Sequence, residues 1–141
     1  RIPVGMFYDE KKSRMRLIDY KLNAFDIQDV SKQNYIILSQ RAAGSNYDEK
    51  NIGRQFSNLI KIANSLNLKI KSSISEIEYF PTDDNFMLYL RNGVKALCQL
   101  ENYSGRLGRI DIVLSGYNPE EIDYIDLRFK NIYLMPKKTG G

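Results

Sequence analysis

The 141-residue sequence contains no histidine and only one cysteine, Cys98. Without histidine the chain cannot build Ser-His-Asp or Cys-His catalytic arrangements, nor the usual histidine-based metal sites. A single thiol excludes a thiolate zinc cluster and an intramolecular disulfide. Neither GxGxxG nor P-loop spacing occurs, so nothing indicates a phosphate cradle. We therefore expect no catalytic residue, metal, cofactor or small-molecule substrate, and the chain is not predicted to be an enzyme.

Long hydrophobic runs are also missing. The longest uninterrupted aliphatic stretch is Ile36 to Leu38, whereas about 20 apolar residues are needed to span a bilayer. We expect no part of this sequence to cross a membrane. Because it begins with Arg1 rather than methionine and shows no signal-like segment, it is interpreted as a piece of a longer protein.

Charge of one sign is in only small excess, with 21 basic residues against 17 acidic ones and a net charge of +4. Nucleic-acid-binding domains usually concentrate their basic residues on one face or stripe. The densest basic cluster here consists of Lys11, Lys12, Arg14 and Arg16. A generally basic surface without a nucleic-acid partner is the preferred interpretation, and a basic nucleic-acid-binding domain is the alternative.

Short runs of β-forming residues, separated by turn residues, dominate the chain and predict strands. The expected strands are Met6 to Tyr8, Met15 to Tyr20, Ala24 to Ile27, Tyr35 to Leu38, Ile70 to Phe80, Asn85 to Leu90, Val94 to Leu100, Tyr124 to Phe129 and Ile132 to Met135. In the last long strand, period-two alternation places Ile125, Leu127 and Phe129 on one face, which we expect to belong to the core.

Helical periodicity is clear in one segment, expected as a helix over Asn46 to Leu66. Ser45 followed by Asp48 resembles a capping box at its start. Apolar residues recur at spacings of three and four and form one stripe, made of Ile52, Phe56, Leu59, Ile60, Ala63 and Leu66. A shorter helix is expected at Arg106 to Leu114. The fold class predicted is α+β: a mostly antiparallel β-sheet on which one long amphipathic helix and one short helix pack.

The strongest local signal is Asn92-Gly93 between two β-rich runs. Both central positions of a type I′ turn require positive φ, which Asn and Gly tolerate best, so a hairpin with a two-residue loop is predicted. In that register Leu88 would face Leu97, and Tyr89 would face Ala96. Neither face would be purely polar, which favours a position inside the sheet.

The last third of the chain resembles a known family. Residues 124–129 read Tyr-Ile-Asp-Leu-Arg-Phe, similar to the terminal (Y/I)-(V/I)-D-L-R-(Y/F) signature of the bacterial cell division proteins FtsQ and DivIB. The order of elements upstream agrees with this family. At the other end, residues 1–4 resemble the E-R-x-P-x-A element that closes the family's POTRA domain, and residues 17–19 resemble the strand that follows it. Gly5 stands where alanine is usual.

The resemblance implies a domain organisation and a role. Residues 1–4 would end the POTRA domain, residues 5–136 would form the family's β domain, and residues 137–141 would be a flexible tail. The intact protein would have one membrane helix, with this part on the periplasmic side of the inner membrane. Its expected role is a non-enzymatic scaffold that binds the division proteins FtsB and FtsL. A third reading, an unrecognised cell-envelope enzyme, would rely on a lone acidic residue, lysine or tyrosine.

The resemblance also implies where partners bind. The C-terminal segment of FtsB would add a strand at the sheet edge formed by the end of the chain, so that backbone hydrogen bonds give affinity. The expected partner-binding residues are Phe129, Lys130, Asn131, Ile132, Tyr133 and Leu134. The expected structural signature comprises Asp126, Leu127 and Arg128, with Asn92 and Gly93 at the hairpin. Asp126 and Arg128 lie two residues apart and are expected to bridge each other or a neighbouring strand.

Overall fold

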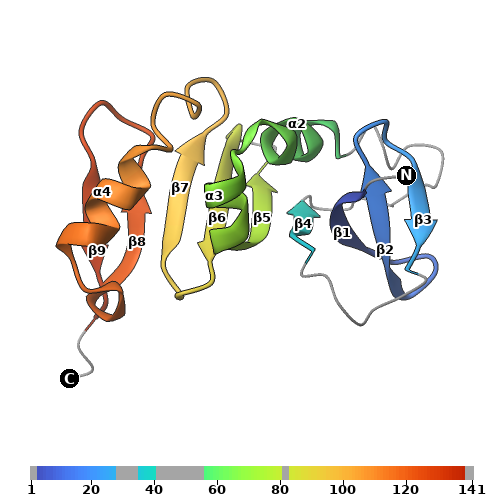
Figure 1. Ribbon diagram of the computed structural model, residues 1–141, viewed down its shortest axis with the longest axis horizontal. Coiled ribbons are helices and arrows are strands. Elements are labelled where there is room, and N and C mark those ends of the chain that lie inside the picture. Colours follow the sequence, from blue (N-terminus) through green and yellow to red (C-terminus); the bar gives the residue numbers. More distant parts are fainter. Residues whose placement is uncertain (1–2, 28–34, 41–55, 81–82, 139–141) are drawn as a thin grey trace.

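A computed structural model describes residues 3–27, 35–40, 56–80 and 83–138 (Figure 1). The strands are β1 (Pro3–Asp9), β2 (Arg14–Asp19), β3 (Ala24–Asp26), β4 (Ile37–Gln40), β5 (Ile74–Phe80), β6 (Asn85–Leu90), β7 (Lys95–Gln99), β8 (Ile122–Asp126) and β9 (Tyr133–Pro136). They form one nine-stranded sheet in the order β3-β2-β1-β4-β5-β6-β7-β8-β9. Only β1–β4, β4–β5 and β7–β8 pair in parallel, so the sheet is mostly antiparallel, as predicted.

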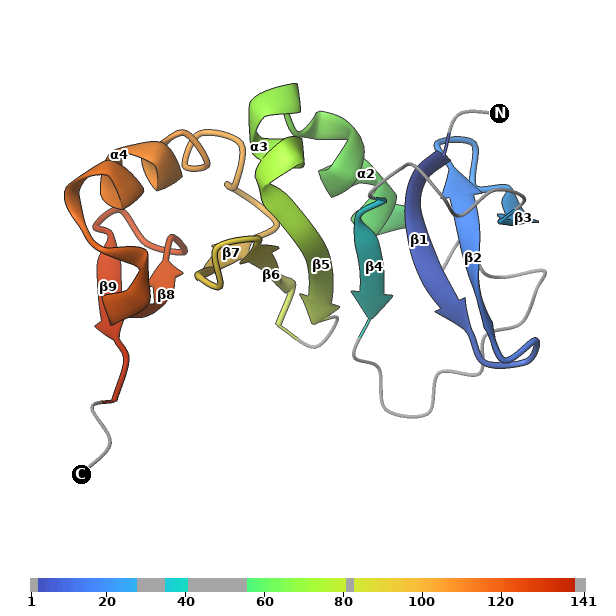
Figure 2. The same cartoon turned by 60° about the horizontal axis from the view of Figure 1, so that its bottom comes forward.

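Three helices, α2 (Ser57–Ser65), α3 (Leu68–Ser73) and α4 (Arg109–Gly116), lie on the same face of this sheet (Figure 2). The core lies between these two layers. The Phe56 ring at the start of α2 packs against Phe7 of β1, with 5.3 Å between centroids. Ile110 and Val113 of α4 are buried at the other end. The α+β class predicted from the sequence is confirmed.

Of the helix predicted over Asn46 to Leu66, the structure describes residues 56–66, where α2 spans Ser57–Ser65. The residues of the predicted stripe that lie in this part are buried: Phe56, Leu59, Ile60, Ala63 and Leu66 are each at most 5% exposed. The predicted start of this helix, with Ser45, Asp48 and Ile52, lies outside the described residues. The short helix, expected at Arg106 to Leu114, begins three residues later and ends at Gly116.

The predicted strand Ile70 to Phe80 is wrong in its first part, because residues 68–73 form helix α3 and the strand begins at Ile74. Two observations explain this. The Asn67 side chain caps the helix by accepting a hydrogen bond from the Ile70 amide at 2.9 Å. No residue of α3 is fully buried, so this stretch lacks the burial that a central strand would need.

The predicted two-residue hairpin loop is also wrong, although the hairpin itself exists inside the sheet. Leu88 faces Ala96 and Tyr89 faces Lys95, so the pairing is shifted by one residue. The loop has three residues, 91–93: the Gly93 amide donates to Leu90 O and the Leu90 amide to Val94 O, both at 2.9 Å. Only Gly93 has a positive φ there, of 93°. This is a type I turn followed by a left-handed glycine, and it requires positive φ at one position instead of two.

The predicted strand Tyr124 to Phe129 ends early, at Asp126. Ile125 and Leu127 are buried as expected, but Phe129 is 52% exposed, so its assignment to the core is wrong. The physical reason lies in Asp126, whose carboxylate accepts a hydrogen bond from the Arg128 amide at 3.0 Å. Such a local side-chain to backbone bond competes with the strand ladder and turns the chain out of the sheet.

The sheet face opposite the helices carries a continuous row of paired residues. The row runs across all nine strands through Phe25, Leu17, Met6, Ile37, Glu76, Tyr89, Lys95, Tyr124 and Met135. Seven of these nine residues are apolar or aromatic. Met135 of the edge strand β9 is the last residue of this row. Tyr133, two residues before it, lies on the same face of the sheet.

Candidate partner-binding edge

Strand β9 lies at one end of the sheet, and among the described strands it pairs with β8 alone. Its backbone orientation follows from two hydrogen bonds. The Lys137 amide donates to Glu121 O at 2.9 Å, and the Leu127 amide donates to Leu97 O at 2.8 Å. The backbone N–H and C=O groups of successive residues point to opposite sides of a strand. Since the Lys137 amide points toward β8, the backbone groups of Met135 and Tyr133, two and four residues earlier, also point toward β8. Leu134 and Pro136 direct theirs outward.

Pro136 suits this edge. A proline has no amide to donate, and within sheets it is tolerated where that amide would point to solvent. On the outward side of β9, Leu134 offers both an N–H and a C=O, while Pro136 offers only its C=O. The edge is thus suited to accept a short added strand centred on Leu134.

The opposite edge of the sheet differs from β9. Strand β3 has only three residues, and its Asp26 is held by the Arg14 guanidinium through contacts of 2.9 to 3.1 Å. This ion pair keeps the pKa of the Asp26 carboxyl below its usual range, first through the Arg14 hydrogen bonds. A short, charged edge discourages strand addition. Of the two edges, β9 is the more open to another strand.

The two arginines of the basic cluster singled out in the sequence, Arg14 and Arg16, are engaged in ion pairs. Arg14 binds Asp26, and the buried Arg16 lies 3.2 Å from both Asp9 and Asp26. Arg16 and Asp9 are only 5% and 2% exposed. These guanidinium groups are therefore occupied within the fold and are not available as a basic stripe for phosphate groups.

Residues 127–132 form the turn between β8 and β9. Phe129 of this turn and Tyr133 of β9 form an exposed aromatic pair. Phe129 and Tyr133 are 52% and 50% exposed. Their rings meet edge to face with 6.1 Å between centroids. The Arg128 guanidinium lies over the Phe129 ring, 5.1 Å from its centroid. Exposed aromatic side chains of this kind are common energetic anchors of protein interfaces.

Asp126 and Arg128 bridge each other. The Arg128 Nε and Nη2 atoms donate to the two carboxylate oxygens at 3.0 and 2.8 Å. Burial by itself would raise the pKa of the Asp126 carboxyl, but the hydrogen bonds and charge of Arg128 outweigh it and the pKa lies below its usual range. The same hydrogen bonds raise the pKa of Arg128. The pair fixes the direction in which the chain leaves β8.

The other residues predicted to bind the partner differ in burial. Ile132 and Leu134 are partly buried against the core. Lys130 and Asn131 are exposed. The structure thus brings Phe129 and Tyr133 together on the outside, while Ile132 and Leu134 point inward. Asn92 and Gly93 lie in the β6–β7 loop, where the Asn92 side chain accepts a hydrogen bond from the Val94 amide at 3.0 Å.

Sequence reasoning missed two residues of this region, Arg106 and Arg109. Each donates a hydrogen bond to a carbonyl of the turn that lies 21 residues further along the chain. Arg106 Nη1 lies 3.2 Å from Leu127 O, and Arg109 Nη1 lies 2.7 Å from Lys130 O. No spacing in the sequence indicates such contacts. A weak signal was available, because a basic residue at the start of a helix, such as Arg109, opposes the helix dipole and needs another explanation.

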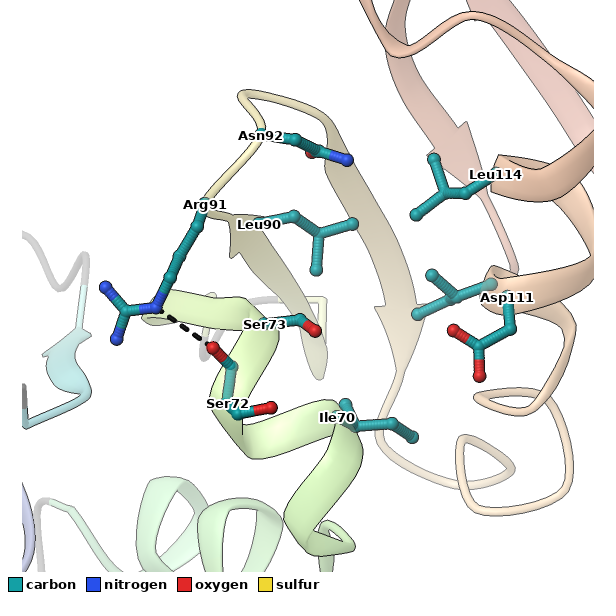
Figure 3. A pocket seen from close by; sticks show the side chains of 9 residues that line it. Ile70, Ser72, Ser73, Leu90, Arg91, Asn92, Asp111 and Leu114 are labelled. Carbon is teal, nitrogen blue, oxygen red and sulfur yellow. Dashed lines mark hydrogen bonds between the residues drawn. The ribbon is translucent and has the colours of Figure 1, made fainter.

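A separate cleft of about 300 Å³ lies between α3, the β6–β7 loop and α4 (Figure 3). Ile70, Leu90, Ile110 and Leu114 form its apolar walls, and Asn92 and Asp111 lie at its margin. The Arg91 guanidinium points away from this space and donates through Nε to Ser72 O at 3.1 Å. The cleft is open, and its polar groups do not converge as they do in a catalytic pocket.

Within the described ranges, no group of three or more Cys, Asp or Glu side chains is placed to hold a metal ion. In the same part of the chain, no helix is long and apolar enough to span a bilayer.

The family model described as cell division protein FtsQ/DivIB, C-terminal, matches residues 8–128. No curated protein matches the chain significantly. The matched region includes β2 to β8 and ends at Arg128, so the aromatic pair and strand β9 follow directly after it.

Proposed function

This chain belongs to the FtsQ/DivIB family of cell division proteins, and from that premise we propose that it is a non-enzymatic binding module of the division machinery. Its proposed partners are FtsB and FtsL, bound on the periplasmic side of the inner membrane. In the proposed organisation residues 1–4 end a POTRA domain, residues 5–136 form the β domain, and a single membrane helix lies elsewhere in the full-length protein. The ion pairs of Arg14 and Arg16 weigh against nucleic acid as the partner.

The observation that carries the proposal is the outward edge of β9. We propose that the C-terminal segment of FtsB adds a strand there, with its backbone paired to the N–H and C=O of Leu134. Side chains of the added strand would alternate between the two faces. On one face they would neighbour Tyr133 and Met135, and on the other Leu134. The added segment should therefore carry apolar residues at alternate positions, and Phe129 would contribute at the end near the turn.

A titration tests this proposal. The chain is titrated with the periplasmic segments of FtsB and FtsL from the same bacterium, by calorimetry, alongside two matched variants. Tyr133→Asp places a charge on the β9 edge. Tyr20→Asp is the control, since Tyr20 is 56% exposed, against 50% for Tyr133, and lies near the other end of the sheet.

We expect Tyr133→Asp to weaken FtsB binding by about tenfold or more, as loss of an interface anchor does. Tyr20→Asp should bind as the unmodified chain does, and urea unfolding of each variant should show that both remain folded under the conditions of the titration. Absence of binding by the unmodified chain would overturn the proposed function. Equal affinities of the two variants would instead overturn the edge as its location.

A further inference from the structure

Two arginines, one just before α4 and one at its first residue, hold the β8–β9 turn by its backbone. Arg106 donates to Leu127 O and Arg109 to Lys130 O, at 3.2 and 2.7 Å. The two carbonyls that accept these hydrogen bonds, of Leu127 and Lys130, lie on either side of Phe129 in the chain. The exposed aromatic residue is thus the middle of a segment that is anchored at both ends.

The turn has few other means of holding its shape. It joins the last paired residues of two antiparallel strands, Asp126 and Tyr133, and has no regular structure. Its start is fixed by the Leu127 amide, which donates to Leu97 O, and by the Arg128 amide, which donates to the Asp126 carboxylate. Its end is fixed by Ile132, which packs against the core, and by the pairing of Tyr133 with Asp126. Without further contacts, the residues between these two ends would sample many conformations. The arginine contacts remove that freedom.

Arg109 is poorly explained by the needs of its own helix. It is the first residue of α4, where the positive end of the helix dipole disfavours a cation. The helix itself is a firm support, because Ile110 and Val113 are buried in the core. The charged Arg109 side chain on this fixed helix donates to a carbonyl of the irregular turn, so the turn is held in a fixed position relative to the helix.

We infer that Arg106 and Arg109 are positioning residues of the partner-binding edge: they preorganise the β8–β9 turn so that Phe129 meets Tyr133 before the partner arrives. This inference rests on the proposed function. Preorganisation increases affinity because the bound conformation is already populated, and apparent affinity falls in proportion when that population falls. The two arginines act through the turn and are not assigned a contact with the partner.

The test compares Arg109→Gln and Arg106→Gln with a matched control, Arg91→Gln. Arg91 also donates to a backbone carbonyl, that of Ser72 at 3.1 Å, but on the far side of the α3–α4 cleft. Two properties are measured: hydrogen exchange of the amides of residues 128–131 in the free protein, and the Kd for the periplasmic FtsB segment. Arg109→Lys is included because an ammonium group can still donate to Lys130 O.

We expect Arg109→Gln to speed exchange in the turn and to weaken binding by about five- to tenfold, as a fall in the competent population to about a tenth to a fifth would do. Arg106→Gln should act in the same direction. Arg109→Lys should recover part of the affinity, and Arg91→Gln should change neither property. Combined with Phe129→Ala, the Arg109→Gln effect should largely vanish, since the arginine acts through that ring.

Each failure has a distinct meaning. If the unmodified chain does not bind FtsB, the proposed function is wrong. If it binds and Arg109→Gln binds equally well, the positioning role is overturned. If Arg109→Gln weakens binding without faster exchange at residues 128–131, or adds fully to Phe129→Ala, the arginine contacts the partner directly and preorganisation is again overturned.

Discussion

Two proline substitutions at neighbouring positions of β9 should have opposite effects. The Tyr133 backbone points toward β8, whereas that of Leu134 points outward, as the hydrogen bonds of Lys137 and Leu127 require. Tyr133→Pro should therefore damage the fold. Leu134→Pro removes an amide that none of the described strands uses, so it should spare the ladder and impair strand addition.

The magnitudes follow from the cost of a lost hydrogen bond. A backbone acceptor left without its donor costs about 1–3 kcal/mol. For Leu134→Pro this cost falls on the complex and corresponds to a Kd roughly 5- to 150-fold higher. For Tyr133→Pro it falls on the free protein and lowers the free energy of unfolding by about the same 1–3 kcal/mol. Leu134 is partly buried, so Leu134→Ala is the control for its lost side chain.

The assay combines urea unfolding of each variant with calorimetric titration of the periplasmic FtsB segment. Leu134→Pro should unfold close to Leu134→Ala and bind more weakly than it. If the two bind equally well, no partner strand pairs with the outward backbone of β9. If Tyr133→Pro is as stable as the unmodified chain, the orientation assigned to β9 is incorrect.

Three further outcomes follow from the fold. Gly5→Ala should lower the free energy of unfolding by about 1–3 kcal/mol, since its Cβ would lie 2.7 Å from Leu38 Cγ; Gly105→Ala, with nothing within 4 Å of the added Cβ, should not be destabilising through a clash. Asp126→Asn should cost roughly 1 kcal/mol at neutral pH. Because the pKa of Asp126 is lowered in the fold, its pair with Arg128 stabilises the folded state above pH of about 4. As the pH falls below that value, the urea midpoints of the unmodified chain and of Asp126→Asn should approach each other. A midpoint difference independent of pH would refute the ion pair. Burial, and then the nearby Asp126 charge, raises the pKa of Cys98 to about 12, so a thiol reagent at pH 8 should label it only on unfolding; rapid labelling of the folded chain would contradict its burial.

The sequence by itself determined where most of the strands lie, and it indicated the family. Strand positions were predictable because alternation of side chains has a short period and needs no knowledge of distant residues. The hexamer beginning at Tyr124 indicated the FtsQ/DivIB family, to which the chain belongs. The lack of histidine limits the chemistry of the chain whatever its fold.

Only the tertiary structure decided which strand is the edge and how the turn before it is held. Strand order depends on the parallel pairing of β7 with β8, which the α4 crossover makes possible. The hairpin register shifted because one extra loop residue changes every cross-strand pair, and the residues around Asn92 suit either loop. Arg106 and Arg109 meet their carbonyls across 21 residues of chain. Contacts of that range arise from packing α4 on the sheet, and no local periodicity records them.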